Sequence, residues 1–486
     1  MNVSNVENEI VDKDLQDFVM KMEEVTSPSN ISIDPYDIEA VSGDLSLLPK
    51  FHYKFKEEYR ACAVIRPSNT EELSKIMKAC LEYPIPITIR SAGTSCYSAS
   101  SPTKGGVVID MRTMNQIHDV DSEKMIVKCD AGISWLRLIE HLLDFGLVPK
   151  VYPTSYKSSC IGGFVATSGK AGLGVLKYGS MKDTLISVTF VRPDGTIEKI
   201  TQDSKGDLTL DDICGSFGIY GAIAEVEFSV ASLQTSMELI GFGFKSRKNA
   251  IDFYSTLQKD NTHKPIFLSF SNKRFEKYAH WTYPAQDFFV FAMYYDNPDV
   301  ISKDKSFVND AASKFSGVAT EDWYLKEKWR HISDTELNLG RWCQNLIFQE
   351  YWISENKLQD FYDHYGKKSV KRDYNKASYM IAGCDGRSRI KLFGLTDADN
   401  PREFFGIKSI FHDMMVFTYN IKERLYSAGV VNTLYFLKFH PEEVVQAQKL
   451  KNMVDPDDLV NSYRLVKSKM WYIRLQLFFA VAKILF

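Results

Sequence analysis

The feature of this sequence that most constrains its fold is a strand pattern that ends in a run of small residues. Residues 85–90 read IPITIR, and residues 91–95, SAGTS, follow directly. The β-branched residues predict a strand, and small side chains let successive backbone N–H groups turn toward an anion. Two interpretations stay open at this point: a cradle for a phosphate group, and a structural loop between two strands.

Two later segments have the same character. Residues 160–172 read CIGGFVATSGKAG, and residues 214–224 read CGSFGIYGAIA. Glycines and small hydroxyl residues allow a backbone to approach a flat ligand closely. The three segments together predict one binding site.

The order of strand and helix patterns predicts an α+β fold. The first half contains strands at residues 62–66, 85–90, 107–110, 125–129, 185–192 and 222–230, and helices at 73–81 and 134–144. From residue 235 the order strand, helix, strand, strand, helix occurs twice, and the last helix is expected at 403–425. Two such βαββα units, of the ferredoxin-like kind, predict a second domain built on antiparallel sheet.

Charge and cysteine content argue against several classes of protein. A net charge of −3 over 486 residues gives no reason to expect nucleic acid as a partner. The eight cysteines are scattered without a CxxC pair, which argues against zinc and iron–sulfur sites. The acidic N-terminus lacks a signal-peptide pattern, so we expect reduced thiols and a cytoplasmic location.

The last residues form an apolar tail. Residues 470–486 read MWYIRLQLFFAVAKILF, with Arg474 inside the apolar run. As a helix this tail is short for a bilayer crossing. A helix lying on a membrane surface and a terminal helix docked on this protein or on a second copy are equally weighted alternatives.

The order of the motifs resembles the FAD-linked oxidases and dehydrogenases related to vanillyl-alcohol oxidase, nearest the glycolate oxidase and D-lactate dehydrogenase branch. The resemblance rests on RSAGTS at residues 90–95, GGVVID at 105–110, CIGGFVATSGKAG at 160–172, KYG at 177–179 with Asp183, and GSFGIYGAIA at 215–224. The segment DPDDLVN at 455–461 is similar to the family's closing motif.

The resemblance implies a division of the chain into an FAD-binding domain with two subdomains and a cap domain. The implied parts are a lead-in at residues 1–30, the FAD-binding domain at 31–234, the substrate or cap domain at 235–440, a segment returning to the FAD domain at 441–466, and the apolar tail at 467–486.

The resemblance also implies which residues contact FAD. The first loop would hold the pyrophosphate, the second segment would line the flavin, and the third would face the adenine. The implied residues are Arg90, Ser91, Ala92, Gly93, Thr94, Ser95, Ser155, Gly162, Gly163, Ala166, Thr167, Ser168, Lys177, Gly221, Ala222 and Ile223, with Tyr178 near the ring. Relatives with a covalent flavin have a histidine where this chain has Thr94, so we predict non-covalent FAD.

The chain departs from this family where the hydroxy-acid branch binds a divalent metal. The nearest counterpart is IAGCDGRSR at residues 381–389, in which Ala382 and Arg389 stand at the two histidine positions and Arg387 at the asparagine position. We therefore predict no catalytic metal. Arg387 and Arg389 lie two apart on a predicted strand, so they share one face.

These two arginines have two interpretations: a clamp for a carboxylate or phosphate beside the flavin, and solvated side chains on an exposed sheet face. The segment KEKWRHISD at 326–334 resembles the family's segment with a substrate-binding arginine, which points to Arg330. Glu350, in QEYWIS, is expected near the substrate, or else as a buried structural carboxylate.

The function that this resemblance implies is an FAD-dependent dehydrogenase that oxidises a small hydroxylated or anionic molecule by hydride transfer to FAD. Its electron acceptor would be a quinone or an electron-transfer protein, with the apolar tail as a contact to a membrane surface. Two alternatives remain: a redox-neutral flavoenzyme resembling alkylglycerone-phosphate synthase, and a flavin-binding or electron-transfer subunit without catalysis.

Overall fold

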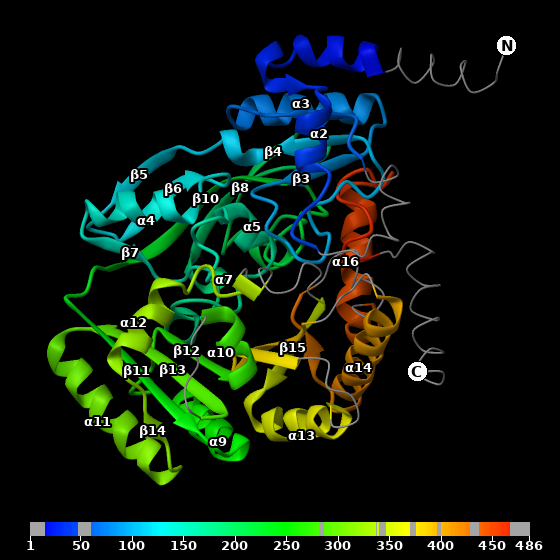
Figure 1. Ribbon diagram of the computed structural model, residues 1–486. Coiled ribbons are helices and arrows are strands. Elements are labelled where there is room, and N and C mark those ends of the chain that lie inside the picture. Colours follow the sequence, from blue (N-terminus) through cyan, green and yellow to red (C-terminus); the bar gives the residue numbers. More distant parts are fainter. Residues whose placement is uncertain are drawn as a thin grey trace.

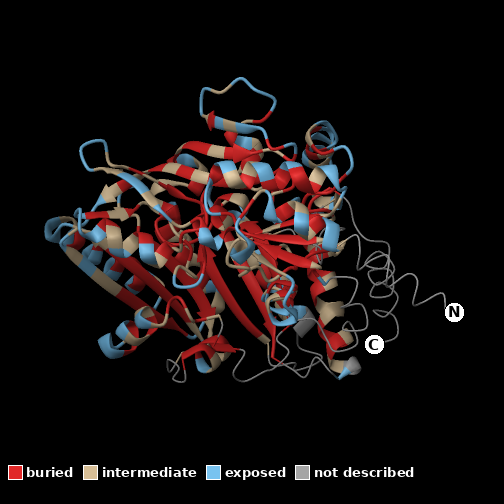
Figure 2. Cartoon of the chain, turned by 90° about the horizontal axis from the view of Figure 1, so that it is seen from above, coloured by how far each residue is buried: buried red, intermediate tan, exposed pale blue. Residues whose placement is uncertain are grey.

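The computed structural model describes residues 15–46, 60–280, 286–336, 338–339, 347–369, 376–395, 400–427 and 437–466. The first half of the chain forms the upper part of Figure 1, and the large sheet with its helices forms the lower part. Figure 2 shows that the strands of both parts are buried, while exposed residues lie mainly on the outer helices and loops. The predicted apolar tail lies outside the described residues.

The first sheet has four strands in the order β1-β2-β4-β3. They are β1 (Ile31–Ser32), β2 (Ala63–Ile65), β4 (Val107–Asp110) and β3 (Ile87–Arg90), with helices α2 (Pro35–Val41) and α3 (Thr70–Glu82). β2 and β3 run parallel to β4, and every residue of β4 is buried, as is usual for a parallel strand covered on both faces. Asn69 begins α3 by accepting the N–H of Glu72 at 2.9 Å.

The second sheet has six strands and packs against the first through α3. Its order is β5-β6-β10-β8-β9, and β7 pairs with β10. The strands are β5 (Ile117–Asp121), β6 (Ile126–Asp130), β7 (Leu147–Pro149), β8 (Leu185–Val191), β9 (Ile197–Thr201) and β10 (Ala222–Ser232). Leu73 and Ile76 of α3 share one core with Ile109 of the first sheet and Val191 of the second. Helix α4 (Trp135–Leu143) covers the second sheet with the fully buried Trp135.

The third sheet is antiparallel, with eight strands in the order β14-β11-β13-β12-β16-β17-β15-β18. The strands are β11 (Ser236–Phe244), β12 (Phe267–Asn272), β13 (Phe288–Asp296), β14 (Val318–Ala319), β15 (Ile347–Ser354), β16 (Lys376–Ala382), β17 (Arg387–Gly394) and β18 (Arg424–Leu425). This sheet confirms the prediction of an antiparallel second half.

The two faces of the third sheet have different neighbours. Helices α9 (Arg247–Lys259), α11 (Pro298–Lys314), α13 (Leu358–Ser369) and α14 (Pro401–Asn420) pack on one face in a single core. The other face packs with α10 (Lys273–His280) and α12 (Asp322–Arg330) and with residues of the first half, among them Leu173 and Tyr178. We call these the helix face and the flavin-domain face, the second after the FAD-binding domain that the sequence predicts for the first half.

Several elements differ from those predicted. The sequence analysis did not identify α10, α12, β5, β9 or α16 (Pro441–Val454). The helix predicted at residues 403–425 is too long, because α14 ends at Asn420 and Arg424–Leu425 form the edge strand β18. Lys422 has a φ of +60°, in the left-handed region that interrupts a right-handed helix.

The chain returns to the first sheet after α16, which lies beside both parts in Figure 1. Val460 forms a parallel bridge with Ile87 of β3, and Asn461 accepts the N–H of Ile89 at 2.9 Å. The buried Lys451 ammonium donates to the carbonyls of Ile219 and Val460 and pairs with Asp455. Among the described helices, none is long and apolar enough to cross a bilayer.

Candidate active site

The first glycine-containing loop is fixed at its base by Arg90. This side chain is 7% exposed, and its Nη1 donates to the carbonyls of Gly43 at 2.7 Å and Ser100 at 3.3 Å. Gly93 has a φ of +68°, and a Cβ there would collide with the Arg90 guanidinium. Arg90 is therefore a support of the loop, and position 93 requires glycine.

Residues of this loop fit an anionic ligand. In the part of the chain that the structure describes, the backbone N–H groups of Gly93, Thr94 and Ser95 have no hydrogen-bond partner. The Ser95 hydroxyl accepts the N–H groups of Tyr97 at 3.2 Å and Ala99 at 3.3 Å, which holds the turn in place. Successive free N–H groups in a turn of small residues form a concave anion site.

The second segment lies against this loop. Gly162, in α5 (Ile161–Ala166), donates its N–H to the Ala131 carbonyl at 2.8 Å, and a Cβ there would lie 2.8 Å from the Ala131 Cβ. A Cβ on Gly163 would meet only Ser91, at 3.8 Å. Gly162 thus packs into the core, whereas Gly163 faces the loop and leaves open space beside it.

The third segment meets the end of α5. Phe217 donates its N–H to the Ala166 carbonyl at 2.9 Å, and Ser168, at a φ of +75°, contacts Gly215. Gly221 has a φ of +147°, and a Cβ there would collide with the Val191 carbonyl. The structure therefore brings the three predicted segments together in space.

Several predicted contact residues have local roles in this structure. The Thr167 hydroxyl donates to the Gly163 carbonyl at 2.9 Å, and the Ser155 hydroxyl donates to Ser159 at 3.3 Å. The side chains of Ala222 and Ile223 are buried in the two cores on either side of β10. For those two residues, only the backbone is left to contact a ligand.

Lys177 and Tyr178 connect the two halves of the molecule. The Lys177 ammonium pairs with Asp296 of β13 at 2.8 Å, and Tyr178 packs against the core on the flavin-domain face. Asp183 accepts the N–H of Ser180 at 2.6 Å and so begins α7 (Met181–Thr184). Lys177 is engaged by this interdomain ion pair, which the sequence did not indicate.

Four charged side chains form a cluster on the flavin-domain face of the third sheet. Arg389 and Lys391 of β17 pair with Glu336 at 2.5 and 2.6 Å, and with Glu350 of β15 at 3.6 and 3.5 Å. The side chains of Arg389, Lys391 and Glu350 are 12%, 5% and 7% exposed. We call Arg389, Lys391, Glu336 and Glu350 the charged cluster.

The charged cluster keeps Glu336 ionised. Burial alone would raise its pKa, but the charges of Arg389 and Lys391 lower the pKa of Glu336 to about 2. Glu336 is therefore an anion at neutral pH and a poor proton acceptor there.

The charged cluster lies next to the first loop. Lys391 Nζ is 4.1 Å from the ring centroid of Phe348, and that ring meets Tyr97 edge-on with centroids 5.5 Å apart. Burial raises the pKa of Tyr97 well above its usual range. Among the described residues, the Tyr97 hydroxyl and Arg389 Nε are buried donors without a hydrogen-bond partner.

The other predicted arginines lie outside the charged cluster. Arg387 is on the same strand, but its Nε faces Glu423 at 3.6 Å. Arg330 ends α12 with a side chain that is 73% exposed and pairs with Glu327 at 3.1 Å. Lys391 could have been found from the alternation in RSRIK at residues 387–391, whereas no sequence signal marks Glu336.

One group of three potential metal ligands occurs among the described residues: His118, Asp130 and Glu225. It lies on β5, β6 and β10 of the second sheet, where His118 Nε2 is 2.8 Å from Asp130 and Lys128 pairs with Glu225 at 2.8 Å. These ion pairs explain why the three side chains lie close together, so the group needs no metal ion to account for it.

Comparison with known proteins identifies the first half. Residues 61–201 match the family model described as an FAD binding domain. A mitochondrial D-lactate dehydrogenase (cytochrome) of Arabidopsis thaliana is 34% identical over 193 residues, which cover 39% of this chain and 34% of that protein. The glycolate oxidase subunit GlcD of Bacillus subtilis is 24% identical over 431 residues, 85% of this chain and 90% of that subunit. This chain covers 47% of a D-lactate dehydrogenase of Archaeoglobus fulgidus, so it spans less than half of both D-lactate dehydrogenases.

Solved structures share the fold over nearly the whole chain. A p-cresol methylhydroxylase with bound substrate has a TM-score of 0.79 at 14% identity, covering 94% of this chain and 97% of that one. An alkyldihydroxyacetonephosphate synthase has a TM-score of 0.73 at 18% identity, covering 92% and 84%. The matched domain, the three adjoining loops and the relatives lead to one conclusion: this chain is a flavoprotein that contains an FAD-binding domain, and FAD is its cofactor.

Proposed function

We propose that this protein is an FAD-dependent dehydrogenase that oxidises a small 2-hydroxy acid. The observation that carries this proposal is the charged cluster beside Tyr97, on the sheet face that meets the FAD-binding domain. Two of the relatives are named for lactate and glycolate, which are both 2-hydroxy acids.

The first loop, with Gly93, Thr94 and Ser95, would hold the FAD pyrophosphate through its backbone N–H groups. Gly163 and Ser168 would lie against the ring system. FAD supplies the acceptor for a hydride when it is bound. Because residue 94 is a threonine, we propose that the flavin is held without a covalent bond.

The charged cluster would bind and orient the substrate. The two cations and the two carboxylates of the cluster balance in charge. The cluster would therefore bind a substrate through individual hydrogen-bond donors and not through a net positive charge. Arg389 Nε and the Tyr97 hydroxyl are both buried and unpaired among the described residues, and each can donate to an oxygen of the substrate. Because Glu336 stays ionised, its role is to hold Arg389 and Lys391 in position.

The electron acceptor follows from the same proposal. One relative carries "cytochrome" in its name, which supports an electron-transfer protein as the partner of this chain. A quinone is the second acceptor to test, by adding each acceptor to the reduced protein without oxygen.

Gly163→Ala tests where the flavin lies. The added methyl group meets only Ser91, at 3.8 Å, so the protein should fold normally. If the ring packs against this position, overpacking by one methyl group weakens FAD binding about 5- to 100-fold. Titration of the FAD-free protein with FAD measures this.

Gly206→Ala is the matched control for this variant. Residue 206 lies in an exposed loop, and its new Cβ would meet only the Leu208 carbonyl, at 3.8 Å. If Gly163→Ala binds FAD as tightly as wild type does, the flavin ring does not pack against this position.

An absorbance spectrum of the purified protein tests the function. Acid precipitation should release FAD into the supernatant, and anaerobic addition of D-lactate, glycolate or D-2-hydroxyglutarate should bleach the bound flavin. The rate should be unchanged by a chelator, since the hydroxy-acid metal ligands are replaced by Ala382 and Arg389. Bound flavin that no hydroxy acid bleaches would reject this proposal in favour of redox-neutral chemistry or a subunit without catalysis.

A further inference from the structure

The chain that follows α16 packs against strand β3, directly before the first glycine-containing loop. We call residues 455–464 the closing segment. Ile87 of β3 donates its N–H to the Leu459 carbonyl at 2.8 Å, and its own carbonyl accepts the N–H of Asn461 at 2.9 Å. The closing segment therefore pairs with the strand that carries this loop.

The closing segment also contacts the residues that follow the first loop. The fully buried Arg464 donates to the carbonyl of Ala99 and, through Nη2 at 2.8 Å, to the carbonyl of Ser101. Ile87 precedes the first loop, whereas Ala99 and Ser101 follow it. One late segment of the chain therefore holds the first loop from both sides.

Asn461 joins the closing segment to the other two FAD segments. The residue is buried, its Oδ1 accepts the N–H of Ile89 at 2.9 Å, and its Nδ2 donates to the Phe217 carbonyl at 3.1 Å. A Cβ on Gly218 would lie 2.6 Å from Nδ2, so the third FAD segment comes as close to the amide as a glycine allows. Phe217 donates its own N–H to the Ala166 carbonyl, at the end of α5. One amide therefore connects β3 with the third segment, which is bonded to the second.

Both the backbone and the side chain at position 461 favour asparagine. Asn461 has a φ of +47°, in the left-handed region that asparagine and aspartate tolerate better than most other residues with a side chain. Its amide presents an acceptor to Ile89 and a donor to Phe217, whereas an ionised carboxylate presents only acceptors. The donor to Phe217 is therefore the property that distinguishes asparagine from aspartate here.

We infer that Asn461 is a positioning residue for FAD. In the proposed arrangement the first loop holds the pyrophosphate and the third segment faces the adenine, and Asn461 fixes the distance between these two parts. A site that has its binding geometry before the ligand arrives binds more tightly, because less ordering is needed on binding. This role rests on the proposed FAD contacts and is independent of the substrate, so the release of FAD is the property to measure.

Asn461→Asp tests this role, because it changes only the hydrogen-bonding atoms of the side chain. The ionised carboxylate still accepts the N–H of Ile89 but leaves the Phe217 carbonyl without its donor. Burial raises the pKa of such a carboxyl, and when it is protonated its O–H can donate to this carbonyl again. We expect FAD release about 10- to 100-fold faster than from wild type at about pH 8, and near the wild-type rate at about pH 5.5. Fluorescence of the free flavin after dilution of the FAD-loaded protein measures the rate.

Wild type over the same pH range is the first control. It contains the other charged groups of the closing segment and its surroundings, which are Lys104, Lys451, Asp455, Asp458 and Arg464. Any pH dependence of release that these groups cause appears in both proteins. The difference between the two proteins therefore reports on position 461.

Thr103→Val is the matched control, because it removes another hydrogen bond to the closing segment. The Thr103 hydroxyl donates to the Ser462 carbonyl at 2.9 Å, and this carbonyl keeps a bond from Arg464 at 3.2 Å in the variant. The contacts of Asn461 are unchanged. FAD release should stay at the wild-type rate at both pH values.

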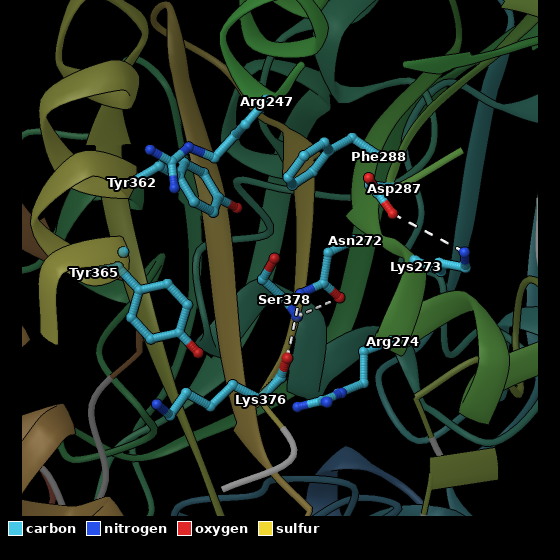
Figure 3. Close-up of a pocket in the computed structure, with 11 residues that line it drawn as sticks. Arg247, Asn272, Lys273, Arg274, Asp287, Phe288, Tyr362, Tyr365, Lys376 and Ser378 are labelled. Carbon is cyan, nitrogen blue, oxygen red and sulfur yellow. Dashed lines mark hydrogen bonds and ion pairs between the residues drawn. The ribbon is translucent and has the colours of Figure 1, made fainter. Parts of the chain in front are cut away.

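Tyr365→Phe is a distant control. Figure 3 shows Tyr365 in a pocket of about 340 Å³ on the helix face of the third sheet. Its hydroxyl forms no hydrogen bond with a described residue, and the core in which it packs contains no described residue of the closing segment. FAD release from this variant should also be unchanged.

Asn461→Gly decides the case in which Asn461→Asp loses its FAD during purification. Glycine adopts a positive φ without strain and removes both bonds of the amide, so FAD release should be fast at both pH values. Release at the wild-type rate from either variant of Asn461 at the higher pH would overturn the positioning role. So would an Asn461→Asp rate that is raised equally at both pH values, or a Thr103→Val rate as high as that of Asn461→Asp.

Discussion

Arg389→Ala is expected to slow reduction of the bound flavin by hydroxy acid by about 100- to 1,000-fold, the effect of removing a buried donor from a reaction site. The arginine is 12% exposed and pairs with both carboxylates of the charged cluster. Its loss removes the unpaired Nε donor and leaves Glu336 and Glu350 with Lys391 alone. Anaerobic stopped-flow absorbance of the flavin measures the rate.

Two variants make the result specific. Arg389→Lys keeps the charge but lacks a donor at the Nε position, so its rate should lie between those of wild type and Arg389→Ala. Arg330→Ala removes a 73% exposed arginine and should reduce flavin at the wild-type rate. A wild-type rate in Arg389→Ala, at full FAD content, would show that the substrate binds elsewhere.

Lys451→Met should destabilise the FAD-binding half by about 3–5 kcal/mol, the usual cost of leaving one partner of a buried ion pair alone. Lys451 and Asp455 are 1% and 0% exposed at their side chains and lie 2.5 Å apart. The ammonium also donates to the carbonyls of Ile219 and Val460 at 2.7 and 2.5 Å, which joins the third FAD segment to the returning chain. Urea unfolding followed by flavin fluorescence measures the change.

Lys449→Met is the control, since residue 449 is an exposed position of the same helix. Its unfolding midpoint should stay at the wild-type value. If Lys451→Met unfolds at the wild-type urea concentration, the buried pair contributes nothing to the attachment of the returning chain.

The three small-residue loops could be predicted because glycine is needed there for local reasons. Gly93 and Gly221 have positive φ values and no room for a Cβ. Only glycine fits these positions, so its presence in the sequence marks the loops. Six strands of this half were predicted from their β-branched residues, β4 with its observed ends, while β1, β5, β7 and β9 were missed. The loops and most of the core strands of the FAD-binding half could therefore be predicted from local sequence patterns.

Side-chain partners that are distant in sequence could not be predicted in this way. Lys177 was expected near the flavin, but Asp296, distant in sequence, engages its ammonium. Glu336 follows α12 without any motif, and it reaches Arg389 because α12 and the residues after it pack on one face of the third sheet. Lys328 and Glu276, 1% and 0% exposed and 2.7 Å apart, form another buried pair that only the packing of α10 and α12 creates.

The return of residues 459–461 to β3 constrains the order in which the parts of the chain can complete their folding during synthesis. Asn461 bonds to Ile89 across 372 positions, so the sheet that carries the first loop stays incomplete until the ribosome has released this late segment. The strands of the third sheet, at residues 236–425, all emerge earlier. Domains usually fold as they leave the ribosome, from the N-terminus onward. Here the first half can be completed only after residues 459–461 have been synthesised.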